Sequence, residues 1–170
     1  GVLKMLTIDS SNFFESIKQL NICPVCISYE YDPCDYLKAR EMQLKRDKPG
    51  WKKSRKDDLV TMQVGINGKK GRMVYRMTQS INHDIDKALA ENPALLKLSK
   101  NEQIQFVCNL IDQHIHAAYE IYERGEKFDQ YIEGQIAKIN LSNKDEQFLR
   151  EKLYEMYDNQ VKNYEKVNAL

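Results

Sequence analysis

Apolar residues spaced three or four positions apart predict short helices in the first part of the chain. This pattern covers residues 13–20, directly after Asn12, a residue type that favours a helix N-terminus, so a helix is expected there. Asp32 and Pro33 mark a second helix start, because aspartate caps helices and proline suits the first helical position. This second helix is expected to run to about Lys45.

The period of the pattern changes to two over residues 59–64, which alternate in side-chain type as a β-strand does. Residues 67–71 are turn formers, and residues 73–77 are of types that favour strands. Together these segments predict a β-hairpin. Residues 27–31 also alternate and are compatible with an extended segment.

The rest of the sequence has a helical period to its end. Ser99 and Glu102 form a capping-box pattern, and the helix after them is expected to end at Gly125. The expected helices begin near Ser80, Ser99, Phe128 and Ser142. Because their connections are short, these four helices predict an antiparallel bundle. The expected fold class is therefore α+β and predominantly helical, with a zinc knuckle and a β-hairpin ahead of the helical bundle.

Charge divides the 170 residues into two parts. Residues 1–78 carry a net charge of +6 and residues 79–170 a net charge of −5. We therefore expect a basic, cysteine-rich α+β module over 1–78 and an acidic four-helix region over 79–170. The hydrophobic content of 42% indicates a globular chain, and no apolar run approaches the ~18 residues that span a bilayer. A cytoplasmic protein without membrane contact is expected.

Three of the four cysteines, Cys23, Cys26 and Cys34, lie within 12 residues of one another. In a reducing compartment such a cluster indicates metal binding rather than disulfides. Zinc requires four thiolate or imidazole ligands arranged as a tetrahedron, so the cluster lacks one ligand. We expect His83 to supply it, with zinc as the cofactor.

Other interpretations of these residues stay open. Cys108 and His114 are alternative fourth ligands, although their apolar neighbours favour a buried thiol and a hydrogen-bonded core histidine. Cys34 is expected in the first turn of its helix, where the partial positive charge favours a thiolate. Thiol–disulfide exchange through Cys23 and Cys26 is less consistent with the pattern, because no helix signal directly follows them.

The order of elements around the cysteines resembles the treble-clef arrangement of zinc domains. A cysteine pair in a turn is followed by a hairpin and by a ligand in the first turn of the next helix. The resemblance covers residues 23–90 and departs from the family in an inserted helix and in Ile27, which stands where glycine is usual. It implies a structural zinc ion, completed by His83, whose removal unfolds the N-terminal half.

Cations are concentrated before residue 78, on the expected helix, the segment after it and the hairpin. Lysine and arginine contact nucleic-acid phosphates, and Trp51 or Tyr75 is available to stack on bases. The expected nucleic-acid-binding residues are Lys45, Arg46, Lys52, Lys53, Arg55, Lys56, Lys69, Lys70, Arg72 and Arg76.

These features predict a zinc-stabilised regulatory or accessory protein that binds nucleic acid, binds a protein partner through its C-terminal helices and is not an enzyme. One alternative is an adaptor or inhibitor of the mobile-element or viral type that binds only protein. A metal-dependent nuclease is a second alternative, because Asn82-His83-Asp84 after a hairpin resembles the hairpin–helix metal fold of some nucleases. Tyr154, Tyr157 and Tyr164 on the last helix are compatible with a homodimer seam.

Overall fold

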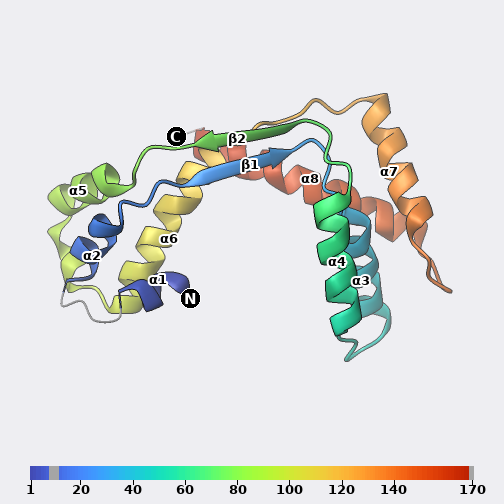
Figure 1. The fold of residues 1–170 in the computed structure, drawn as a ribbon, viewed down its shortest axis with the longest axis horizontal. Helices are drawn as coiled ribbons and strands as arrows, with labels where there is room; N and C mark the ends of the chain where they lie inside the picture. Colours follow the sequence, from blue (N-terminus) through green and yellow to red (C-terminus); the bar gives the residue numbers. More distant parts are fainter. Residues whose placement is uncertain (8–11, 169–170) are drawn as a thin grey trace. The chain divides into compact units, whose positions relative to one another are not determined.

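The structure, a computed structural model, describes residues 1–7 and 12–168 and is predominantly helical, with a small antiparallel pair of strands (Figure 1). The chain divides into two compact units, and each unit contains segments from both halves of the sequence. The first unit consists of Gly1–Ile27, Tyr75–Tyr119 and Lys166–Leu170, and the second of Ser28–Val74 and Glu120–Glu165. The expected predominance of helix and the small antiparallel strand pair are confirmed.

The first unit packs α2 (Phe13–Leu20) against α5 (Asn82–Glu91) and α6 (Lys100–Ala117). The short helices α1 (Val2–Leu6) and η1 (Pro93–Lys97) complete it. The helix expected over residues 13–20 is confirmed, and the Asn12 side chain accepts the Glu15 N–H at 3.3 Å. The buried core of the first unit consists of Phe13, Phe14, Ile17, Ile81, Ile85 and Val107.

The second unit contains α3 (Asp35–Asp47), α4 (Arg55–Asn67), α7 (Glu126–Lys138) and most of α8 (Glu146–Asn168). The helix expected after Asp32 is present as α3, but it begins two residues later than predicted, with Cys34 rather than Asp32 as its N-cap; the Asp32 carboxylate accepts the Cys34 N–H at 2.9 Å. The core of the second unit consists of Ala39, Phe128, Ile132, Ile136, Ile139, Leu149, Leu153 and Tyr157. Each large side chain buried there contributes roughly 1.5–3 kcal/mol.

The strand expected over residues 59–64 is wrong, because these residues belong to α4. A capping box starts this helix: Ser54 Oγ accepts the Asp57 N–H at 3.2 Å, and the Asp57 carboxylate accepts the Ser54 N–H at 3.0 Å. No residue of α4 is buried. An alternating pattern that packs against no sheet does not stabilise a strand, and the local cap favours a helix.

The strand expected over residues 73–77 is confirmed as β2 (Met73–Met77), but its partner is β1 (Val25–Tyr29). Backbone hydrogen bonds on either side establish the antiparallel register, from Thr78 N to Pro24 O and from Glu30 N to Arg72 O, both at 2.9 Å. The partner strands are separated in sequence by α3 and α4, which is why local turn signals could not identify the pairing.

The helix expected to end at Gly125 ends earlier, at Ala117. In the second unit, the Glu120 N–H donates to Ser28 Oγ at 3.0 Å, and the Tyr122 hydroxyl donates to the Ser28 carbonyl at 3.3 Å. These hydrogen bonds to a residue of β1 favour an extended course after α6. The apolar spacing of the sequence does not encode them.

Candidate anion-binding site

Five exposed cations surround the connection between α3 and α4. The connection turns at Lys48, whose carbonyl accepts the Trp51 N–H at 3.0 Å. Within residues 1–7 and 12–168, none of the five forms an ion pair with a carboxylate. Clustered like charges without acidic partners attract anions. We call this set the basic loop surface, and it consists of Lys45, Lys48, Lys52, Arg55 and Lys56.

Two predicted nucleic-acid-binding residues nearby are engaged in ion pairs. Arg46 Nη1 lies 2.8 Å from Asp145 Oδ2, and its guanidinium carbon lies 4.2 Å from the centre of the Phe148 ring. Lys53 Nζ lies 2.8 Å from Glu41 Oε1. These pairs join α3 to the start of α8 and to the loop after α3, so part of the predicted charge is neutralised within the unit.

The remaining predicted cations follow α4. Lys69 is exposed, whereas Lys70 donates to two carbonyls at the end of α4, at 3.1 and 3.2 Å. The Arg72 guanidinium lies 5.0 Å from the centre of the Tyr122 ring. Arg76 belongs to the first unit, where it donates to the Ala118 carbonyl at 3.0 Å. The structure thus gathers all the predicted cations except Arg76 in the second unit.

A cleft of about 690 Å³ in the second unit is lined by the start of α3, the loop after α4 and α7. None of the residues lining it has a carboxylate side chain. The Lys138 ammonium lies 5.5 Å from the centre of the Tyr36 ring, so a cation and an aromatic ring are adjacent there. We call it the lysine–tyrosine cleft, after Tyr31, Tyr36, Tyr131, Lys69, Lys70 and Lys138.

Two glycines place the lysines of this cleft. A Cβ at Gly68 would lie 2.3 Å from the Pro33 Cβ, so only glycine allows the backbone to approach so closely. Gly71 has a φ of +65°, and a Cβ there would lie 2.6 Å from the Glu30 carboxylate. The loop backbone is therefore held against the residues after β1, and Lys69 and Lys70 are presented at the cleft.

A buried hydrogen-bond network supports the α7 wall of the cleft. The Asp35 carboxylate is 0% exposed and accepts the hydroxyls of Tyr131 at 2.7 Å and Tyr157 at 2.8 Å. The Gln135 amide also donates to Asp35, and Lys138 donates to the Gln135 amide oxygen. Burial raises the pKa of Asp35, although the donated hydrogen bonds oppose this shift. The network holds Tyr131 and Gln135 in one orientation.

Sequence reasoning missed the aromatic residues of the cleft and Lys138. Lys138 lies on α7, far along the chain from Lys69 and Lys70, and no local motif connects them. The signal available in the sequence was the Gly-Lys-Lys-Gly segment, whose residue types also fit a hairpin turn. Only the tertiary structure brings the tyrosines and Lys138 into one cleft with Lys69 and Lys70.

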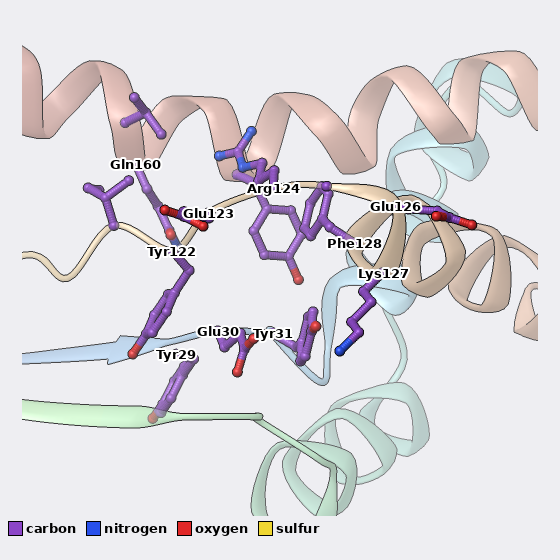
Figure 2. A pocket seen from close by; sticks show the side chains of 14 residues that line it. Tyr29, Glu30, Tyr31, Tyr122, Glu123, Arg124, Glu126, Lys127, Phe128 and Gln160 are labelled. Atoms are coloured by element: carbon purple, nitrogen blue, oxygen red, sulfur yellow. The ribbon is translucent and has the colours of Figure 1, made fainter.

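A second cleft, of about 390 Å³, also lies in the second unit and is drawn in Figure 2. Its lining includes Glu30, Glu123 and Glu126 together with Arg124 and Lys127. These opposite charges favour neither an anion nor a cation. The electrostatic preference for an anion is therefore a property of the lysine–tyrosine cleft, not of both clefts.

We compared the chain with family models, with curated proteins and with solved structures. No match was found in any of the three comparisons. Among the described residues, no helix combines the length and the apolar character needed to cross a membrane.

The predicted zinc ligands fall in different units. Cys23 and His83 are exposed and Cys26 is buried in the first unit, whereas Cys34 belongs to the second. Among the described residues, no three or more His, Cys, Asp or Glu side chains form a group that could hold a metal ion. The zinc site stays a prediction. Bound zinc in the purified protein, lost in Cys34→Ser and in His83→Ala, is the expected result, and protein purified without zinc contradicts it.

Cys34 has a different environment from the one predicted. It caps α3, but its thiol is buried and donates to the Thr61 carbonyl of α4 at 3.4 Å. Burial, assisted by the Asp32 carboxylate, raises the pKa of the Cys34 thiol. This shift is opposite to the one expected from the helix dipole, because desolvation disfavours the charged thiolate.

The alternative ligand His114 has a carboxylate partner. Its Nε2 lies 2.7 Å from Asp84 Oδ2, between α6 and α5 of the first unit. The expected hydrogen bond of this half-buried histidine is confirmed. Cys108 is half-buried on α6.

Proposed function

We propose that the protein binds nucleic acid through the second unit, with the basic loop surface on the phosphate backbone. The observation that carries this proposal is the set of five exposed cations without ion-pair partners among the described residues. Phosphates that replace their counterions would release those ions, so the affinity is expected to fall steeply with salt.

The position of two of these cations supports a role outside folding. Arg55 and Lys56 occupy the first two positions of α4, where the helix dipole disfavours positive charge by about 0.3–1 kcal/mol per residue. Asp57 and Asp58 in the same turn offset part of this cost. The two cations therefore do not stabilise the helix that carries them, as expected of residues whose charge serves a ligand.

The test measures binding of a labelled single-stranded oligonucleotide over a range of salt concentrations. Trp51, the only tryptophan, lies within the loop and provides an independent fluorescence signal. Replacement of Lys52, Arg55 and Lys56 by glutamine removes three phosphate contacts. The slope of log affinity against log salt should therefore become shallower by about 2.

A matched control replaces three cations elsewhere in the second unit, Lys127, Lys144 and Lys162, by glutamine. This variant loses the same net charge and should keep the wild-type slope. If both variants lose the same amount of slope, the effect depends only on net charge, and the proposed surface is overturned. No binding by the wild-type protein at low salt would overturn the function itself.

A second candidate function is protein binding without nucleic-acid contact. It is favoured by three exposed apolar residues on one face of α4: Leu59 is 66% exposed, Met62 63% and Ile66 75%. Charge reversal of Lys52, Arg55 and Lys56 separates the two functions. It should abolish oligonucleotide binding under the first and leave partner capture unchanged under the second.

A further inference from the structure

The lysine–tyrosine cleft offers both positive charge and aromatic surface to a ligand, whereas the basic loop surface consists of cations only. Three lysines supply positive charge, and none of the lining residues supplies a carboxylate to compensate it. Three tyrosines supply aromatic surface in the same cleft. A ligand that satisfies both must carry an anionic group and a planar ring close together.

Local geometry brings these two features within the reach of one small molecule. The Lys138 ammonium is 5.5 Å from the centre of the Tyr36 ring, and Tyr31 stacks on Tyr131 with ring centres 4.2 Å apart. The cleft volume of about 690 Å³ lies within the range of small-ligand sites, roughly 300–1,000 Å³. A phosphate held by Lys138 would place an attached ring at Tyr36.

Much of the cleft is held in place by its own contacts. Lys70 is bound to the α4 carbonyls, while Asp35 and Gln135 hold the Tyr131 hydroxyl. Lys69, which also lines the cleft, is exposed. A site whose walls are largely preset loses little conformational entropy on binding.

We propose that the lysine–tyrosine cleft binds a nucleotide, with the phosphate between Lys69 and Lys138 and the base against Tyr36 and Tyr31. The shared chemistry is an aromatic base that carries a phosphate. A free nucleotide and a nucleotide unit of a single strand both provide it. The site is separate from the basic loop surface, so it does not require the proposed function to be correct.

The experiment titrates the full-length protein with adenosine monophosphate, with inorganic phosphate and with adenosine. Tyr36→Leu keeps an apolar side chain but removes the ring, and should weaken adenosine monophosphate binding about tenfold. Its binding of inorganic phosphate should not change. Lys69→Gln, at an exposed position, should weaken both phosphate-bearing ligands but not adenosine.

Lys127→Gln is the matched control, because it removes a lysine from the mixed-charge cleft of the same unit. It should leave all three affinities unchanged. Adenosine monophosphate binding that is absent, or that is unchanged in both Tyr36→Leu and Lys69→Gln, overturns the nucleotide site. Equal affinity for adenosine monophosphate and inorganic phosphate also overturns it, since the base would then contribute nothing.

The loop variant, with Lys52, Arg55 and Lys56 replaced by glutamine, separates this site from the proposed function. It should lose oligonucleotide affinity and keep adenosine monophosphate affinity; loss of both overturns a separate cleft. If the wild-type protein binds adenosine monophosphate but no oligonucleotide, the ligand is a free nucleotide and only the proposed function fails. If oligonucleotide competes with adenosine monophosphate, the ligand is a unit of the strand.

Discussion

At the residue scale, Asp35 of the second unit is an ionisable group buried away from solvent. It is 0% exposed, and among the described residues no lysine or arginine pairs with it. Instead it accepts hydrogen bonds from Tyr131, Tyr157 and Gln135, and from the Tyr36 N–H at 2.5 Å. A buried carboxylate is tolerated only with such donors, since a lost donor leaves it unsatisfied at a cost of about 1–3 kcal/mol.

Because burial raises the pKa of Asp35, this residue makes stability depend on pH. The native protein keeps the proton at pH values where the unfolded chain, with an ordinary aspartate pKa of about 4, has lost it. The contribution of Asp35 to the free energy of unfolding should therefore fall as pH rises from about 4 through its native pKa. Urea unfolding of wild type and Asp35→Asn across pH isolates this contribution.

Tyr157→Phe provides a companion variant for that measurement. It removes one donor to the ionised carboxylate, so the native pKa of Asp35 should rise further. The loss of stability should then extend to higher pH than in the wild type. A stability difference between wild type and Asp35→Asn that is flat with pH contradicts the assignment.

At the element scale, α4 shows how a helix can depend on its cap. It buries none of its residues, so tertiary packing contributes little to it, and the Ser54–Asp57 capping box opens it. α6 has the same kind of cap, Ser99 with Glu102, but contributes Val107 to the core of the first unit. The two helices have similar local signals and different packing.

Ser54→Ala should therefore loosen α4 alone. Loss of the cap costs about 1 kcal/mol, which raises amide hydrogen exchange in α4 while the global free energy of unfolding changes by only a few tenths of a kcal/mol. In the matched variant, Ser99→Ala, the same cost should appear in global unfolding, because α6 belongs to a core. Equal global losses in the two variants would show that α4 is part of a cooperative core.

At the scale of the whole molecule, each unit has its own core and draws it from separated parts of the chain. The core of the first unit joins Phe14 of α2 to Ile85 and Val107. The core of the second joins Ala39 of α3 to residues of α7 and α8. Residues 1–78 on their own contain half of the buried core of the first unit, and of the buried core of the second they contain only Ala39.

A fragment of residues 1–78 distinguishes the N-terminal module predicted from charge from the two units seen in the structure. The structure predicts that the fragment does not fold, because the partners of Phe14 and Ala39 follow residue 78. Circular dichroism should show little helix and no cooperative thermal transition. A fragment that unfolds cooperatively, with or without added zinc, would support the predicted N-terminal module instead.

The sequence by itself determined the features that depend on neighbouring residues. Asn12 and Ser99 provide cap bonds within three residues, so the starts of α2 and α6 were predicted correctly. The cations of the loop after α3 were also evident, because their charge needs no partner to be recognised. Helix caps and net charge are local properties, and local properties can be inferred from the order of residues along the chain.

The tertiary structure decided the features that depend on residues far apart in sequence. It paired β2 with β1 across two helices and buried the Cys34 thiol against α4. It also assembled the lysine–tyrosine cleft and the Asp35 network from α3, α7 and α8. The physical reason is that burial and long-range hydrogen bonding set strand pairing, pKa and cleft composition. The spacing of residues along the chain encodes none of these directly.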